Sequence, residues 1–277
     1  MCRHLAYLGP PVTLSALVTE PPHGLLHQSY APRDMRGGGT VNADGFGVGW
    51  YPGEAGTPPE PVRYRSERPI WSDTAFAGIA GATRSAAVLA AVRSATVGMP
   101  VHAGACAPFA DGRWLFSHNG VVRGWPDSVV ALAAGLPTAD LLTLDAPTDA
   151  VLLWALVRHR LRRGEDPAAV LAETVLAVAD AAPGSRLNLL LTDGTGVWAT
   201  AWTHALSVHV TAEAVLAASE PLDERPGWTA VHDRHLVVAR PGTCRTTALA
   251  AGTPPQHPSP KRSRGDRCAT PSSSTSI

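Results

Sequence analysis

The chain has very little lysine, no long apolar run and none of the common nucleotide motifs. Lys261 is the only lysine among 277 residues, although Lys+Arg and Asp+Glu both number 23 and the formal net charge is +0. A balanced charge gives no sign of a nucleic acid or a strongly acidic partner. No run reaches the roughly 18 apolar residues of a membrane-spanning helix, so we expect none.

The cysteines and histidines lack the spacing of a metal site. The four cysteines form no C-x-x-C pair, and the eleven histidines include no H-E-x-x-H motif. No P-loop is present, and the alternating glycines Gly45, Gly47 and Gly49 are not spaced for a dinucleotide. We therefore expect neither a metal nor an organic cofactor. The N-terminus is not predicted to be a secretion signal, so a cytoplasmic location with reduced thiols is expected.

Apolar patterning predicts strands, then two helices, then further strands. The first strands are expected at 3–8, 46–51, 62–65, 87–92 and 113–117, with a long loop over 20–41. The helices are expected over 149–163 and 166–182, capped by Thr148 or Asp149 and by Asp166. The later strands are expected at 187–192, 196–202, 206–211, 215–219 and 236–239. This order is typical of an α+β fold rather than an alternating βαβ fold.

The composition predicts one domain and a tail. Residues 2–250 carry the predicted elements, whereas 253–277 are rich in Pro, Ser, Thr and Arg. Four basic residues against Asp266 give this tail a local net charge of +3. With so few apolar groups we expect it to be disordered, with a basic docking tail as the alternative.

Cys2 is the first candidate for chemistry. Trimming of Met1, usual before a small residue, would leave a thiol and a free α-amine on one residue. An α-amine has a pKa of about 7.7–8.0, against about 10.4 for lysine, so it can accept a proton near neutral pH. One residue could then supply both nucleophile and general base. The alternative is a small residue at the start of a strand.

Three other segments have two interpretations each. Asn119-Gly120 could hold an oxyanion through a side-chain amide and a backbone N–H, or form a tight turn. Arg93 could bind a carboxylate with two hydrogen bonds, or form a structural ion pair. Asp149 could bind an ammonium group or cap its helix.

Together these segments resemble the class II glutamine amidotransferases of the N-terminal-nucleophile hydrolase superfamily. The matching pieces occur in the family's order and cover about residues 2–245. They are Met1-Cys2-Arg3, Asn42-x-Asp44-Gly45-x-Gly47-x-Gly49, Arg93-x-Ala95-Thr96-x-Gly98, Ala107-Pro108-Phe109, Ser117-His118-Asn119-Gly120, Thr148-Asp149 and Ser219-Glu220-Pro221-Leu222.

The resemblance implies a four-layer αββα sandwich and a set of roles. Cys2 would attack a γ-glutamyl carbonyl while its α-amine relays protons, and Asn119 and Gly120 would form the oxyanion hole. Substrate binding is implied for Arg93 at the α-carboxylate and Asp149 at the α-amine. The matched motifs also add two expected substrate-binding residues, Thr96 and His118. Cys106 has no implied role and is expected to be a packing residue.

Departures from the amidotransferase pattern point to a substrate other than free glutamine. Val92, Ser94 and Ala107 replace the family's usual histidine, aromatic residue and histidine. Within the superfamily the sequence resembles the amidohydrolases of ergothioneine biosynthesis through runs such as Gln28–Arg33, Ala90–Pro100 and Pro226–Trp228. We therefore expect hydrolysis of a small γ-glutamyl amide, with the oligomeric state left open. The alternatives are a glutaminase subunit that supplies ammonia to a partner synthase, and a non-catalytic binding protein of the same fold.

Overall fold

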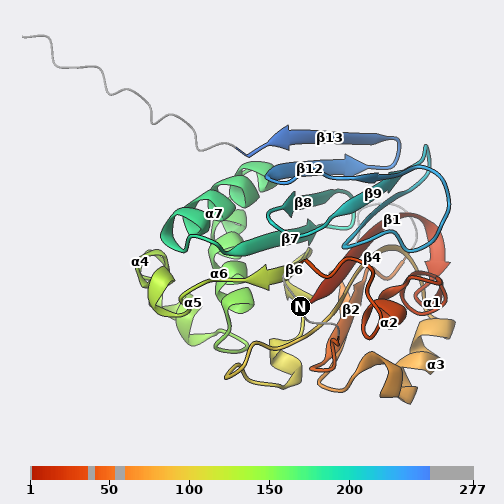
Figure 1. Ribbon diagram of the computed structural model, residues 1–277, viewed down its shortest axis with the longest axis horizontal. Helices are drawn as coiled ribbons and strands as arrows, with labels where there is room; N and C mark the ends of the chain where they lie inside the picture. The colour runs from red at the N-terminus through yellow and green to blue at the C-terminus, as the bar shows by residue number, and fades with distance from the viewer. Residues whose placement is uncertain (1, 37–40, 54–59, 250–277) are drawn as a thin grey trace, which may run out of the picture.

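The computed structural model describes residues 2–36, 41–53 and 60–249. Two antiparallel sheets lie face to face, and helices cover the outer face of each (Figure 1). Three clusters of buried apolar side chains fill the three interfaces, one between the sheets and one beneath each helical layer. The predicted α+β fold, a four-layer αββα sandwich, is confirmed.

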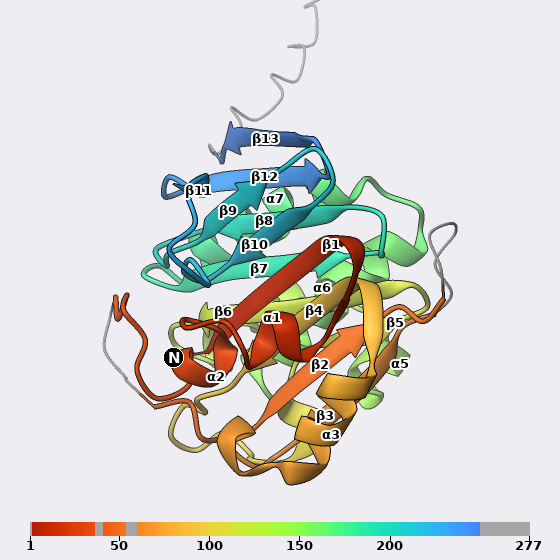
Figure 2. The ribbon, with the colours of Figure 1, turned by 90° about the vertical axis from the view of Figure 1, so that its right-hand side faces the viewer.

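The seven-stranded sheet has the order β11-β9-β10-β1-β4-β2-β3. Its strands are β1 (Arg3–Thr13), β2 (Phe46–Trp50), β3 (Val62–Ser66), β4 (Arg84–Val92), β9 (Ser207–Val210), β10 (Val215–Ala218) and β11 (Trp228–Ala230). β1 lies in the middle, paired with β4 on one side and β10 on the other (Figure 2). The N-terminal strand is therefore held along both edges.

The six-stranded sheet has the order β13-β12-β8-β7-β6-β5. Its strands are β5 (Phe109–Asp111), β6 (Trp114–Val121), β7 (Arg186–Thr192), β8 (Val197–Ala201), β12 (His235–Arg240) and β13 (Thr243–Ala248). Side chains alternate across β6: Leu115 packs between the two sheets, whereas Phe116 packs under the helices. This alternation decides which face each residue of the candidate site occupies.

Helices close both outer faces. The seven-stranded sheet packs against α1 (Ser15–Val18), α2 (Leu25–Gln28) and α3 (Thr74–Ala82), and the six-stranded sheet packs against α6 (Asp149–Arg162) and α7 (Pro167–Ala181). Two short helices, α4 (Val130–Ala133) and α5 (Thr138–Leu142), precede α6, and single 3-10 turns occur at Ile70–Ser72, Ala103–Ala105 and Asp127–Val129. The Thr148 hydroxyl accepts from the Val151 N–H at 3.3 Å, so Thr148 rather than Asp149 caps α6.

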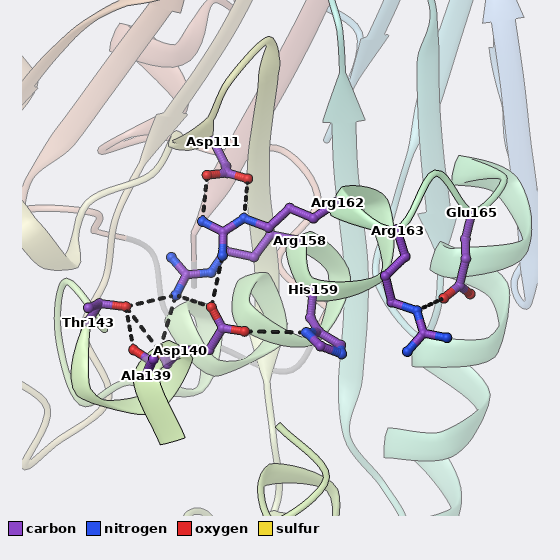
Figure 3. Close-up of polar contacts among 9 residues, drawn as sticks. All are labelled: Asp111, Ala139, Asp140, Thr143, Arg158, His159, Arg162, Arg163 and Glu165. Carbon is purple, nitrogen blue, oxygen red and sulfur yellow. Dashed lines mark hydrogen bonds and ion pairs between the residues drawn. The ribbon is translucent and has the colours of Figure 1, made fainter. Parts of the chain in front are cut away.

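A buried carboxylate fastens α6 to its surroundings. Asp140 of α5 lies 2.9 Å from Arg162 Nη1, 3.5 Å from Arg158 Nη2 and 3.3 Å from His159 Nδ1 (Figure 3). Arg162 also reaches both carboxylate oxygens of Asp111, at 2.7 and 2.8 Å, beside the start of β6. These ion pairs fix the helix that begins next to the candidate site.

The observed elements differ from the predicted ones in several places. β1 continues past Pro10 to Thr13 through a register shift between Leu8 and Val12, because the irregular segment still pairs with β4. The region expected as a loop over 20–41 contains α2, and the unpredicted helix α1 precedes it. The helix α3 and the strands β5, β11 and β13 were not predicted.

The described residues give two further findings. None of the helices in these ranges combines the length and apolar character that a membrane span requires. No group of three His, Cys, Asp or Glu side chains within them is placed to hold a metal ion. The tail predicted over 253–277 lies outside the described residues.

Candidate active site

Cys2 lies immediately before β1, at the end of a central strand of the seven-stranded sheet. Its Sγ is 3.8 Å from the carbonyl oxygen of Ser94. The register pairs Arg3 with Val92 at the end of β4, which brings the segment after β4 alongside Cys2. The half-buried thiol therefore has Arg93 and Ser94 as neighbours on one side.

A single hydroxyl connects the start of β1 to Asn119 in the other sheet. The Asn119 side-chain amide donates to Ser219 Oγ at 3.3 Å. The same Oγ accepts from the His4 N–H at 3.0 Å and donates to the His4 carbonyl at 3.3 Å. All three residues are buried. Asn119 is therefore fixed relative to the strand that Cys2 begins.

Asn119 and Gly120 lie inside β6 and do not form a turn. They pair with Asn188 and Leu187 of β7, so the tight-turn alternative is wrong. Asn119 Oδ1 is buried without a hydrogen-bond partner among the described residues. A Cβ at position 120 would lie 1.8 Å from the carbonyl oxygen of Arg186, so only glycine fits there.

His118 projects from the face of β6 opposite Asn119. Its Nε2 lies 2.9 Å from the Arg186 carbonyl oxygen. Because neighbouring strand residues point to opposite faces, the structure does not bring the His118 ring to the Asn119 amide. Its assignment to substrate binding stays a prediction, and the observed contact is to β7.

Arg93 organises the segment that follows β4. Its Nη1 donates to the Pro100 carbonyl at 2.9 Å and lies 3.5 Å from the Asp44 carbonyl. The Asp44 carboxylate accepts from the Ala95 N–H at 2.7 Å. The Asn42–Gly49 motif therefore holds the loop after Arg93 next to Cys2, which places the predicted carboxylate-binding residue beside the predicted nucleophile.

Thr96 and Asp149 lie near the exit of β6. A cavity of about 450 Å³ lies between the Thr96–Met99 loop and residues 121–126. The exposed Thr96 contributes to its wall, and Val121 directly follows Gly120. Asp149 is buried and accepts from the Val122 N–H at 2.9 Å and from the Ala150 N–H at 2.8 Å. Its carboxylate thus holds the backbone of Val122, which forms part of the cavity wall.

The buried pair Arg3 and Glu220 was not singled out from the sequence. Arg3 Nε lies 3.6 Å from Glu220 Oε1, and Arg3 Nη2 donates to the Asp34 carbonyl. Glu220 Oε2 accepts from the Arg33 N–H at 2.8 Å and the Asp34 N–H at 3.1 Å. Burial lowers the pKa of Arg3, and Glu220 opposes this shift. Arg3 and Glu220 both lie in motifs that resemble the family, but only the fold shows that the two side chains form an ion pair.

Burial also sets the protonation of two residues near Cys2. Burial, with the nearby His118 and His204, lowers the pKa of His4 to about 3, so His4 is neutral at physiological pH. Burial raises the pKa of Cys106 to about 11. The Cys106 side chain packs where a Cβ on Gly45 would lie 2.4 Å from its sulfur, which agrees with the expected packing role.

Comparison with known proteins identifies the family. Residues 14–212 match the family model described as glutamine amidotransferases class-II. The chain belongs to the class II glutamine amidotransferase family. The resemblance read from the ordered motifs is therefore confirmed.

Three similar proteins match about nine-tenths of the chain. It is 44% identical over 250 residues to a gamma-glutamyl-hercynylcysteine sulfoxide hydrolase of Mycolicibacterium smegmatis, covering 90% of this chain and 100% of that protein. It is 45% identical over 249 residues to a protein of the same name from Mycobacterium tuberculosis, covering 90% and 97%. A solved glutamine aminotransferase class-II domain protein from Silicibacter pomeroyi has a TM-score of 0.63 and 25% identity, covering 90% of this chain and all of that one.

Proposed function

We propose that the protein hydrolyses the γ-glutamyl amide bond of γ-glutamyl-hercynylcysteine sulfoxide, which releases glutamate and hercynylcysteine sulfoxide. The observation that carries this proposal is the Ser219 bridge, which holds Asn119 beside the strand that begins at Cys2. The two mycobacterial relatives, which bear the name of this activity, support the choice of substrate. The reaction belongs to ergothioneine biosynthesis.

In the proposed mechanism Cys2 is the nucleophile. Cleavage of the bond before Cys2 frees an α-amine, which accepts the thiol proton as Sγ attacks the γ-carbonyl carbon. The α-amine then gives that proton to the nitrogen of the leaving amine as the C–N bond breaks. A glutamyl thioester remains on Cys2, and water, deprotonated by the same α-amine, hydrolyses it to glutamate and restores the thiol.

Asn119 and Gly120 stabilise the charge that develops during both steps. Among the described residues the Asn119 side-chain amide gives one hydrogen to Ser219, which leaves its second hydrogen for the substrate, and the Gly120 backbone supplies the other proposed donor. Such donors act because they are already oriented when the carbonyl oxygen becomes an oxyanion. The hydrogen bond to Ser219 gives Asn119 that fixed orientation.

Arg93, Thr96, Asp149 and His118 are proposed to bind the glutamyl half of the substrate. The cavity beside Thr96 lies next to both the Arg93 loop and the end of β6. Arg93 would bind the α-carboxylate with its remaining N–H groups and Asp149 the α-amine. The chemistry requires a reduced Cys2, which is the state of thiols in the cytoplasm, the location we propose.

Glutamate release from two substrates tests the function. We expect the wild-type enzyme to hydrolyse γ-glutamyl-hercynylcysteine sulfoxide with a kcat/KM far above that for glutamine, and Cys2→Ala to hydrolyse neither. A glutamine-like diazo-ketone should add mass to Cys2 alone. A strong preference for glutamine would favour the glutaminase-subunit alternative, and unchanged function in Cys2→Ala would favour the binding-protein alternative. Active protein that retains Met1 would refute the α-amine mechanism.

A further inference from the structure

A second hollow lies at the same end of the seven-stranded sheet as Cys2. Its volume is about 500 Å³, and it is lined by residues 33–36 and by residues within or next to β9, β10 and β11. Among its lining residues are Arg33, Arg36, Glu220, Asp223, Arg225 and Trp228. None of the mechanistic steps above places a part of the substrate in this hollow.

The sheet order places this hollow on the side of Cys2 opposite the glutamyl half. β4, which leads to Arg93, pairs with one edge of β1, whereas β10, which leads to Ser219, pairs with the other. β9 and β11 continue outward from β10 (Figure 2). When Sγ attacks the carbonyl, the acyl group and the leaving amine extend in different directions. If the acyl group lies toward β4, the amine extends toward β10.

Direct contacts link the hollow to the proposed catalytic residues. Ser219 lies in its wall and accepts the hydrogen bond from Asn119. Glu220, also in the wall, is buried and faces Arg3, the residue after Cys2. The wall of the hollow therefore contacts the proposed oxyanion donor Asn119 through Ser219, and it contacts Arg3, which follows the proposed nucleophile, through Glu220. A larger cavity of about 550 Å³ is lined in part by Leu8–Pro11, toward the opposite end of β1. It is too far along the strand from Cys2 to hold the leaving amine.

The charges in the hollow are mixed rather than of one sign. Three arginines and four carboxylates line it, in addition to an indole ring. The leaving half of the proposed substrate carries a trimethylammonium group and carboxylates, so it also has both signs. Arginine fits carboxylates through paired N–H groups, and an aromatic face attracts a quaternary ammonium.

The indole ring of Trp228 is fixed in the wall of the hollow by contacts with Asp223 and His209. Its indole N–H donates to Asp223 Oδ1 at 3.0 Å, and its ring lies 5.4 Å from that of His209. Asp223 also accepts from Arg225 Nε at 2.7 Å. Burial alone would raise the pKa of Asp223, but the hydrogen bonds from Arg225 and Trp228 outweigh it and lower the pKa. One ionised carboxylate thus positions both the indole and an exposed guanidinium.

Resting on the function proposed above, we infer that this hollow binds the zwitterionic amine half of the substrate, with Trp228 against the trimethylammonium group and Arg225 at a carboxylate. Ammonia, the leaving group of glutamine, would leave the hollow unfilled. The subsite therefore explains a preference for a large γ-glutamyl amide over glutamine, a preference that the nucleophile and oxyanion donors alone cannot supply.

Binding of the product, hercynylcysteine sulfoxide, tests the subsite without catalysis. We expect Trp228→Ala to weaken its Kd, measured by calorimetry, by about tenfold, and Trp228→Phe to recover most of that loss. Arg225→Ala alters an exposed side chain, should fold normally, and should weaken binding by a similar factor. Trp71→Ala removes an exposed aromatic residue from outside the hollow and should change the Kd by less than twofold.

Kinetics separate a subsite from a general structural role. Trp228→Ala should raise KM for γ-glutamyl-hercynylcysteine sulfoxide about tenfold while changing kcat/KM for γ-glutamyl methylamide less than twofold. Equal losses on both substrates, an unchanged Kd in both Trp228→Ala and Arg225→Ala, or a loss with Trp71→Ala instead, would overturn the subsite. Wild-type protein that binds the product through Trp228 without hydrolysing the sulfoxide would refute the proposed function and leave the subsite standing.

Discussion

The side-chain amide of Asn119 and the hydroxyl of Ser219 meet at 3.3 Å, across the interface between the two sheets. Ser219 in turn exchanges two hydrogen bonds with the backbone of His4, two residues after Cys2. The hydroxyl uses its one hydrogen and accepts two others, so none of its bonding capacity is left over. Ser219 therefore links the orientation of the proposed oxyanion donor to the strand that follows the proposed nucleophile.

Ser219→Ala should lower kcat because Asn119 loses its orienting partner. We expect a fall of roughly tenfold to a hundredfold, less than the 10²–10³ typical of removing an oxyanion donor, with KM changed less than threefold. Ser72→Ala, which removes an exposed hydroxyl bonded to the Pro69 carbonyl, is the matched control and should keep full activity. Steady-state kinetics of the two variants decide the matter, and an unchanged kcat in Ser219→Ala would contradict the positioning role.

Gly120→Ala should destabilise the protein because its Cβ would overlap the Arg186 carbonyl oxygen. Neither atom belongs to a flexible side chain, so β6 and β7 must separate locally, at a cost of about 3 kcal/mol or more in the free energy of unfolding. Gly78→Ala in α3 meets no atom within 4 Å and should raise stability by about 0.5–1 kcal/mol. Urea unfolding of both variants measures the contrast, and equal stabilities would be inconsistent with the packing described.

The buried histidines predict how stability depends on pH. The pKa values of His4 and His204 both fall to about 3, mainly through burial. In the unfolded chain these groups bind protons below about 6.5, whereas the folded protein does not until pH approaches 3. Stability should therefore be highest above pH 6.5 and decline by up to about 1.4 kcal/mol per pH unit for each histidine as the pH falls toward 3.

The control for this pH effect is a single replacement. His204→Gln should reduce the slope of unfolding free energy against pH by about 1.4 kcal/mol per pH unit between pH 6 and 4, which is the contribution of one proton. Urea unfolding at several pH values gives this slope for both proteins. An identical slope in the variant would show that His204 titrates normally in the folded state.

Cys106 should resist alkylation although it lies in the same region as Cys2. Its sulfur is fully buried and its pKa is raised to about 11, so the thiolate form is scarce at neutral pH. Brief treatment with iodoacetamide followed by peptide mass spectrometry should modify Cys2 and leave Cys106 unmodified until urea is added. Cys2→Ala removes the label from the peptide that carries residue 2, whereas the exposed Cys244 can still react, and this variant serves as the control. Rapid labelling of Cys106 in the folded protein would be incompatible with its burial.

Asp140→Ala should weaken the attachment of α6. The change leaves the buried Arg158 and the partly buried His159 without their shared carboxylate, which costs about 3 kcal/mol of stability (Figure 3). Glu173→Ala removes an exposed partner of Arg160 and should cost less than about 0.5 kcal/mol. Thermal unfolding compares the two, and a loss no larger than that of Glu173→Ala would show that the network contributes little.

The sequence predicts most of this fold where a pattern is strong, and fails where tertiary contacts decide. The caps Thr148 and Asp166 and the periodicity after them locate α6 and α7 to within about two residues. The dipeptide Pro10-Pro11 indicates the end of a strand, yet β1 continues because β4 pairs with the segment beyond it. Helix α3 has a mostly small-residue sequence without clear amphipathic spacing, and only its packing on the sheet stabilises it.

The candidate site shows the same division. The motifs containing Cys2, Arg93 and Asn119 can be recognised along the chain, because they occur together in the order typical of the family. The contacts of Ser219 and Glu220 cannot be predicted in this way. They join segments at least 100 positions apart in the sequence, and the pairing of β10 with β1 and the packing of the two sheets bring them together.

The place of Cys2 directly before β1 has a practical consequence for protein engineering. The proposed mechanism needs a free α-amine on Cys2, and residues fused before it would hold that nitrogen in a peptide bond. β13, in contrast, is the outer strand of the other sheet, remote from Cys2 (Figure 1). Affinity tags and fluorescent reporters should therefore be attached after β13. A leader placed before Cys2 should keep the enzyme inactive until the leader is cleaved.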